Sequence, residues 1–89
     1  SHVTASADDY YIGANTSGGA LEVRLLSAAS VPSGQALVIK DEGGASQSNP
    51  ITVRAHPGQT IDGGASIILE SPYSAVSLYS NGSNAYFIY

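Results

Sequence analysis

The 89-residue chain has no cysteine, no methionine and no tryptophan, and only 11% of its residues are charged, against about 25% in an average soluble protein. Without cysteine it can form no disulfide, carry out no thiol chemistry and bind no zinc through thiolates. Its only cations besides histidine are Arg24, Lys40 and Arg54, and the net charge is −4. Nucleic acids and anionic membranes both require a denser basic surface. We therefore expect no nucleic-acid partner and, because no apolar run approaches about 20 residues, no membrane insertion.

Small polar and apolar residues make up most of what is present. Ser, Gly, Thr and Asn together exceed a third of the chain, and 43% of the residues are hydrophobic, which is too many for a disordered segment. We expect one domain over residues 1–89, excised from a longer chain, and we interpret Ser1-His2 as a remnant of cloning or cleavage. Domains this small often depend on disulfides or partners for stability. Because disulfides are excluded, the sequence favours oligomerisation.

The hydrophobic periodicity is that of β-strands. Residues 21–25 and 51–55 alternate strictly between apolar and polar side chains, as strands with one buried face do. Residues 36–39 and 67–69 are continuous apolar runs, which suit strands covered on both faces. Turn-forming clusters separate these runs, and only residues 25–30 could hold a single helical turn. The sequence predicts an all-β, compact sandwich-like or prism-like domain of about eight short strands.

The C-terminal segment is the clearest single element. Residues 74–80 and 83–89 flank Asn81-Gly82, a pair favoured in two-residue type I′ hairpin turns, and such a turn places Leu78 opposite Ala85. One face of the predicted hairpin then carries Val76, Leu78, Ala85, Phe87 and Tyr89, and the other carries Ser77, Tyr79, Asn84, Tyr86 and Ile88. Because both faces keep large apolar side chains, we expect a subunit interface, with a locally exposed tyrosine patch as the alternative. The expected interface residues are Val76, Leu78, Tyr86, Phe87, Ile88 and Tyr89.

No motif has the spacing of an enzyme active site or a metal site. The chain lacks the Gly-x-Ser-x-Gly and Ser-x-x-Lys patterns of serine nucleophiles and the closely spaced acidic ligands of calcium loops. Asp41 and Asp62 precede glycine-rich turns, where aspartate caps backbone amides, and Asn81 and Gly82 are also expected to be turn residues. We therefore predict no catalytic residue, no metal and no cofactor.

Carbohydrate binding remains open on the residue types present. Sugar sites in β-proteins commonly pair an exposed aromatic ring with amide or carboxylate hydrogen-bonding groups. Tyr79, Tyr86 and Asn84 share a predicted face of the hairpin, and His56, followed by Pro57-Gly58 in a solvent-facing turn, is a further candidate. The competing interpretation of each tyrosine is interface or core packing with its hydroxyl at the rim.

A series of short motifs runs through nearly the whole chain. It is formed by Asp9-Tyr10-Tyr11-Ile12-Gly13, Leu21-Glu22-Val23-Arg24-Leu25-Leu26, Val38-Ile39-Lys40-Asp41, Asn49-Pro50-Ile51-Thr52-Val53, Gly58-Gln59-Thr60-Ile61-Asp62-Gly63 and Val76-Ser77-Leu78-Tyr79-Ser80-Asn81-Gly82-Ser83-Asn84. In this order the motifs resemble a distal β-module of the tail fibres and tailspikes of tailed bacteriophages. Ala85 stands where that family often has an aromatic residue, usually tryptophan, so no packing or sugar-stacking role is carried over to this position.

The resemblance implies a homotrimeric module of an adhesion fibre on the virion, acting at the outside of the bacterial host. Its implied partners are identical chains and bacterial surface polysaccharide or lipopolysaccharide, and its implied function is receptor binding together with trimer assembly. One alternative is a purely structural trimerisation or folding clamp with no ligand. A second is a small glycan hydrolase or esterase, although the depolymerase activity of tailspikes generally belongs to a larger β-helical domain.

Overall fold

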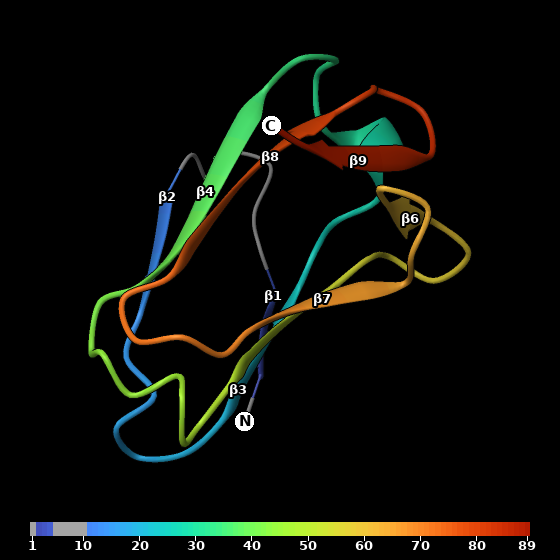
Figure 1. Ribbon diagram of the computed structural model, residues 1–89. Coiled ribbons are helices and arrows are strands. Elements are labelled where there is room, and N and C mark those ends of the chain that lie inside the picture. Colours follow the sequence, from blue (N-terminus) through green and yellow to red (C-terminus); the bar gives the residue numbers. More distant parts are fainter. Residues whose placement is uncertain (1, 5–10) are drawn as a thin grey trace.

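The structure of the chain is a computed structural model that describes residues 2–4 and 11–89, the side chains from residue 11 onward. Ser1 and residues 5–10, which include Asp9 and Tyr10 of the expected leading strand, lie outside the described residues. The described part forms short strands in two mixed sheets, which lie as two layers around one core (Figure 1). The prediction of an all-β fold is confirmed. Within this part of the chain, no helix is long and apolar enough to span a membrane.

Each sheet contains both parallel and antiparallel neighbours. Sheet A has the strand order β1-β3-β5-β7 and is formed by β1 (His2–Thr4), β3 (Leu21–Arg24), β5 (Ile51–Arg54) and β7 (Ser66–Leu69). Sheet B has the order β2-β4-β8-β9-β6 and is formed by β2 (Tyr11–Ala14), β4 (Ala36–Asp41), β8 (Ala75–Ser80), β9 (Ala85–Ile88) and β6 (Thr60–Ile61). The expected helical turn is a short 3₁₀ helix, η1 (Ala28–Ser30).

The chain changes sheet at every connection from β1 to β8. Strand β2 leaves sheet A for sheet B, β3 returns, and the alternation continues until β8 and β9 follow one another within sheet B. Parallel neighbours such as β3 and β5 are therefore joined through a strand of the opposite sheet, while the antiparallel strands β7 and β8 extend the two sheets. With this connectivity, each sheet is built from segments that are distant in the sequence.

The core lies between the two sheets and is built by strand alternation. In sheet A, Val23, Ile51 and Val53 are fully buried. In sheet B, Ile39 and Leu78 are fully buried, and burial alternates along β4 and along most of β8. Because strand side chains point to opposite faces in turn, the intervening residues of β4 and β8 face outward.

The hairpin between β8 and β9 differs from the prediction. Leu78 pairs with Ile88 and Tyr79 with Phe87, so the two strands are offset by three residues from the predicted register. A type I′ turn needs positive φ at both central residues, and of Asn81 and Gly82 only Gly82 has it, at 76°. The Asn81 side-chain oxygen instead accepts the backbone amides of residues 83, 84 and 85 at 2.9, 3.0 and 3.2 Å. The loop is therefore longer than two residues.

This register error also exchanges the faces of β9. A shift by an odd number of residues turns every side chain of a strand to its other face. Tyr86, predicted to share a face with Tyr79, is only 3% exposed and belongs to the core. Phe87 lies beside Tyr79 instead, with ring centroids 5.6 Å apart. Along residues 75–80 and 86–87, the hairpin consequently has one face in the core and one face outside.

Candidate functional site

The outer face of sheet B is apolar over most of its width. Strand β4 presents Ala36 and Val38 outward, because Leu37 and Ile39 point into the core. Neighbouring strands add Tyr11, which pairs with Val38, and Tyr79, which pairs with Ala36. Within the described residues, the polar side chains that share this face include Ser77 in its middle, Lys40 and the Glu42 carboxylate at one end, and Thr60 at the β6 edge. A solvent-facing strand normally alternates to polar residues, so this face departs from the usual pattern.

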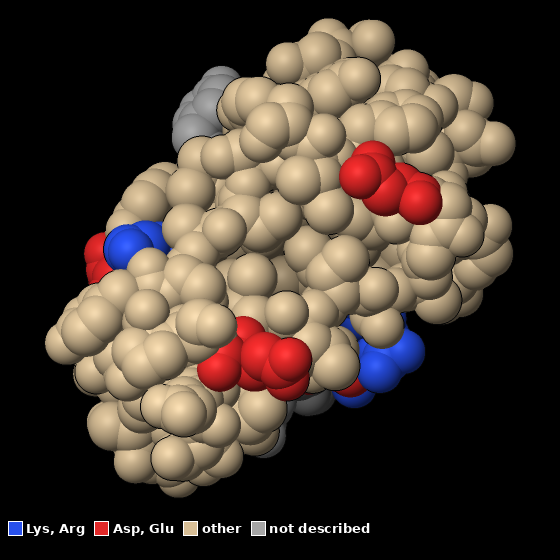
Figure 2. Space-filling view, viewed as in Figure 1, with Lys and Arg blue, Asp and Glu red and all other residues tan. Residues whose placement is uncertain are grey.

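Three aromatic rings gather on this face, and we call them the aromatic cluster: Tyr79, Phe87 and Tyr89. The centroids of Tyr79 and Phe87 lie 5.6 Å apart and those of Tyr79 and Tyr89 5.8 Å apart, both in tilted arrangements typical of favourable aromatic pairs. Their exposed fractions are 37% for Tyr79, 36% for Phe87 and 66% for Tyr89. Figure 2, which has the viewing direction of Figure 1, shows charged residues as separate groups on a mostly uncharged surface.

The end of this face near β2 carries its polar contacts. The Tyr11 hydroxyl donates a 2.7 Å hydrogen bond to the Glu42 carboxylate, and that hydrogen bond raises the pKa of Tyr11. The Lys40 ammonium donates to the Tyr73 carbonyl oxygen and lies 5.9 Å from the centroid of the Tyr73 ring. These charged groups are therefore already engaged within the chain, and they border the apolar region rather than divide it.

The residues predicted to form a subunit interface do not share one surface. Val76, Leu78 and Tyr86 are buried in the core of the chain itself, so their side chains are not available to another chain. Burial raises the pKa of the Tyr86 hydroxyl, which donates to the Leu26 carbonyl oxygen at 3.1 Å. Phe87 and Tyr89 are exposed, as is Ile88, which lies on the opposite side of β9 from Phe87. Val76 and Leu78 are buried by the alternation of β8, and Tyr86 is buried because the register of β9 differs from the predicted one.

The four candidate glycan-binding residues are likewise not brought together. Tyr79 belongs to the aromatic cluster, and Tyr86 is inside the core. Asn84 lies in the exposed hairpin loop, where its side-chain oxygen accepts a 3.2 Å hydrogen bond from the Asn81 amide. His56 is exposed and lines a groove at the sheet A side of the molecule. Of the four, His56 is the one that lines this groove.

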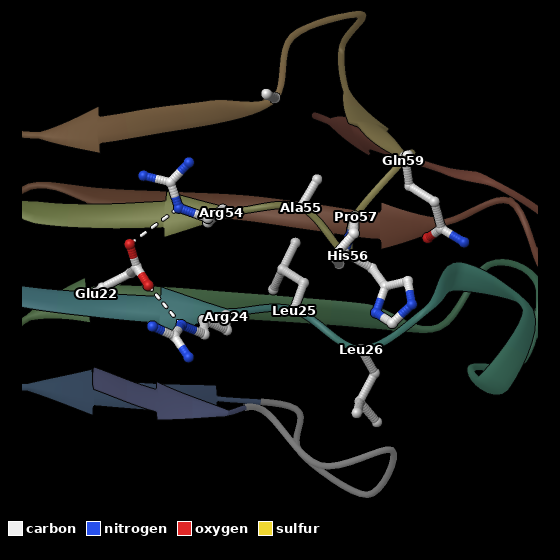
Figure 3. A pocket seen from close by; sticks show the side chains of 11 residues that line it. Glu22, Arg24, Leu25, Leu26, Arg54, Ala55, His56, Pro57 and Gln59 are labelled. Atoms are coloured by element: carbon white, nitrogen blue, oxygen red, sulfur yellow. Dashed lines mark hydrogen bonds and ion pairs between the residues drawn. The ribbon is translucent and has the colours of Figure 1, made fainter.

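That groove has a volume of about 660 Å³ and lies where β3 and β5 end (Figure 3). Volumes of roughly 300–1,000 Å³ are typical of small-ligand sites. Leu25 and Ala55, just beyond the two strands, line it together with Leu26 and Pro57, and the backbone ladder continues here through a 2.9 Å bond from the Leu25 amide to the Arg54 carbonyl oxygen. The lining is thus apolar, with charged side chains along one end.

Two arginines and one glutamate form the charged end. We call the two arginines, Arg24 and Arg54, the arginine pair. Arg24 and Arg54 are register partners on β3 and β5, and Glu22 lies between their guanidinium groups (Figure 3). The Nε atoms of Arg24 and Arg54 donate to separate oxygens of Glu22 at 2.5 and 2.9 Å. These hydrogen bonds, from Arg24 and then Arg54, lower the pKa of Glu22 to about 2. The trio therefore carries one net positive charge at neutral pH.

The opposite wall of the groove is held by Gln59. Its side-chain oxygen accepts the Ala28 amide at 2.8 Å, and its side-chain nitrogen donates to the Ser27 hydroxyl at 2.9 Å. These two bonds fasten the 56–59 turn to the start of η1. The wall that carries His56 and Pro57 is consequently fixed with respect to β3.

The carboxylates that could act in hydrolysis are dispersed or engaged. Asp41 is fully buried and accepts the backbone amides of Gly44, Ser46 and Tyr73 at 3.0 to 3.2 Å. Burial alone would raise its pKa, but the contacts from Ser46, Tyr73 and Gly44 outweigh burial and lower the pKa to about 2. Asp62 accepts the Ile88 amide at 3.0 Å. Asp41 thus caps the glycine-rich turn that follows it, the role predicted for it, whereas Asp62 accepts a backbone amide of β9.

Across residues 2–4 and 11–89, no three histidine, aspartate or glutamate side chains come together as a metal site requires. Comparisons of the sequence with protein-family models and with curated proteins find no match. The arginine pair is the feature that the sequence prediction missed. The signal for it was present, because Glu22, Arg24 and Arg54 all occupy outward positions of two strands with the same alternation.

Proposed function

We propose that the chain is a trimeric distal module of a phage tail fibre or tailspike, which holds identical chains together and contributes to binding host-surface glycans. One observation carries this proposal: the outer face of sheet B is apolar and displays the aromatic cluster. Apolar faces rimmed by polar groups mark protein interaction sites, and tyrosine and phenylalanine are enriched in them. The order of the sequence motifs supports the trimer in particular.

Strand β4 explains why a second copy is the favoured occupant. Residues 36–39 are apolar at every position, as in strands covered on both faces, yet sheet A covers only one face of β4. Most soluble oligomers are closed assemblies of identical chains, and in a threefold ring two different parts of each chain's surface meet. In such an assembly the outer face of sheet B would receive its missing cover.

Analytical ultracentrifugation of the 89-residue chain over a concentration series tests the assembly part. We expect a species of three times the 9.0 kDa chain mass at micromolar concentration. The double variant Tyr79→Ser, Phe87→Ser should sediment as a folded monomer, because it removes two rings of the aromatic cluster. Circular dichroism establishes that this variant retains its strands.

Ile68→Ser is the matched control. Ile68 is 56% exposed, more than either Tyr79 or Phe87, but it lies on β7 in sheet A. It should leave the trimer intact. A native chain that stays monomeric at these concentrations would overturn the proposed assembly, and dissociation by Ile68→Ser as complete as that of the double variant would show that the assembly uses another surface.

A further inference from the structure

We propose that the groove at the end of β3 and β5 binds a carboxylate-bearing saccharide, with the carboxylates toward Arg24 and Arg54 and the sugar rings along the apolar lining. This proposal rests on the glycan-binding part of the proposed function and gives it a site and a ligand class. The sequence prediction assigned glycan contacts to the hairpin tyrosines. The structure favours the opposite side of the sandwich.

The arrangement of charge is the first step of the argument. The chain has only three lysine and arginine residues and a net charge of −4, yet two of the three cations are adjacent on neighbouring strands. Like charges at paired positions of a sheet repel one another, so the pairing is unfavourable without a compensating anion. Glu22 supplies one negative charge, which leaves one positive charge uncompensated among these three residues.

The geometry of the guanidinium groups is the second step. Glu22 accepts a hydrogen bond from the Nε atom of each arginine, and these two bonds fix both side chains. In Figure 3 the terminal nitrogens of Arg24 and Arg54 point away from Glu22, one group on each side of it. The arginine side chains remain 51% and 49% exposed. Each fixed group can therefore offer a pair of N–H donors to a planar carboxylate, the fork geometry that arginine matches best.

The lining of the groove indicates what the carboxylate is attached to. Leu25 and Ala55 lie next to the arginine pair, and Leu26 and Pro57 continue the apolar surface to the far end, where His56 adds a polar group (Figure 3). A sugar ring offers C–H surface on its faces and hydroxyls at its edge, which fits apolar walls with polar groups at the ends. Two separate donor groups suit acids that repeat along a saccharide. A densely charged polyanion is disfavoured, because the chain as a whole is negative.

Backbone amide NMR of the 89-residue chain tests the proposal. The probes are galacturonic, glucuronic and N-acetylneuraminic acids at millimolar concentration, with galactose, glucose and inorganic phosphate as comparisons. We expect at least one acid to shift the amides of residues 24–26 and 54–59 while its neutral counterpart leaves them in place. If no acid shifts these amides, or if neutral sugars shift them equally, the proposal is wrong. If phosphate binds as tightly as the acids, the groove is a general anion site and the saccharide assignment fails.

Charge-matched variants separate this site from general electrostatics. Arg24→Gln and Arg54→Gln should each weaken binding of the acidic sugar about tenfold or more, because each removes one donor fork. Lys40→Gln makes the same change in net charge at sheet B and should leave the affinity unchanged. Equal weakening by all three would overturn the proposal. Ultracentrifugation of each variant tests the assembly separately, and the arginine variants should still form the trimer. A monomeric chain that binds acidic sugars would contradict only the proposed assembly. A trimer that binds no acidic sugar would contradict only the proposed groove site.

Discussion

The two sheets cover the same core but have opposite outer faces. On sheet A the outward positions of β3 and β5 are Glu22, Arg24, Thr52 and Arg54. On sheet B the outward positions of β4 begin with Ala36 and Val38, and β8 and β9 add the aromatic cluster. Folding of a single chain requires only the inward faces to be apolar. We therefore connect the outer face of sheet B with the proposed assembly, whereas the outward positions of β3 and β5 have the pattern of a surface in water.

The largest expected change in stability comes from a substitution on the inner side of β4, compared with one on its outer side. Ile39 is fully buried between the sheets, so Ile39→Ala should cost about 2–5 kcal/mol of unfolding free energy. Val38 is its outward neighbour and is half-buried, and Val38→Ala should have a smaller effect that grows with protein concentration, because association covers the part of its side chain that the single chain leaves exposed. Urea denaturation at several protein concentrations measures both effects.

Either of two results would break the comparison between the faces. One is a cost of Val38→Ala that is the same at every protein concentration, which would mean that Val38 acts within the single chain. The other is an effect of Ile39→Ala that disappears at low concentration. In that case the interior between the sheets would itself depend on association.

An intermediate loss of thermal stability is expected from substitution of Asp41, where the chain passes from sheet B to sheet A. Asp41, the last residue of β4, holds three backbone amides of the following loop and of the segment before β8. Asp41→Ala leaves these amides without their acceptor and should lower the melting temperature by about 10 °C. Asp62→Ala removes one such bond and should lower it by only a few degrees. Thermal melts followed by circular dichroism compare the two variants. An equal decrease in melting temperature would contradict the difference between three bound amides and one.

The smallest expected effect is the acid sensitivity that Glu22 gives to sheet A. The pKa of Glu22 is lowered to about 2, below that of an unpaired glutamate, so its ion pairs stabilise the fold fully above about pH 5 and lose this contribution as the pH falls toward about 2. The melting temperature should decrease by a few degrees over this range, and by less in Glu22→Gln. Glu70→Gln, a change at an exposed carboxylate, is the control. An unchanged acid sensitivity in Glu22→Gln would show that the pairing adds no stability.

Strand positions were predictable because alternation is a local property. The alternating segments 21–25 and 51–55 contain β3 and β5 with the predicted faces, and the apolar run from residue 36 lies in β4. The parallel pairing of β3 with β5 was not predictable, since nothing local specifies a neighbour that is reached through the other sheet. The hairpin register failed for a definite reason. Asn81 binds three backbone amides with its side chain, and this competes with the two-residue turn that Asn-Gly usually favours.

The candidate sites show the same division between local and distant information. Phe87 and Tyr89 could be identified as surface aromatics from the surplus of apolar residues near the C-terminal end, but their partnership with Tyr79 depends on the register. Arg24 and Arg54 were each predicted to face water. Their adjacency, and Glu22 between them, requires the pairing of two strands thirty positions apart in the printed sequence. Sequence patterns thus indicated which side chains are outside and not which of them are neighbours.

The alternation of the chain between the sheets has a consequence for the order of folding. Neither sheet can be completed from consecutive segments, because β4 needs β8 and β5 needs β7 as antiparallel partners. Proteins dominated by such distant pairings generally fold slowly, in milliseconds to seconds. Among the described strands, β8 and β9 are synthesised last, and they also carry the aromatic cluster. The surface that we assign to assembly therefore forms only in the step that completes sheet B, so a nascent chain has no association-competent face before its own fold is closed.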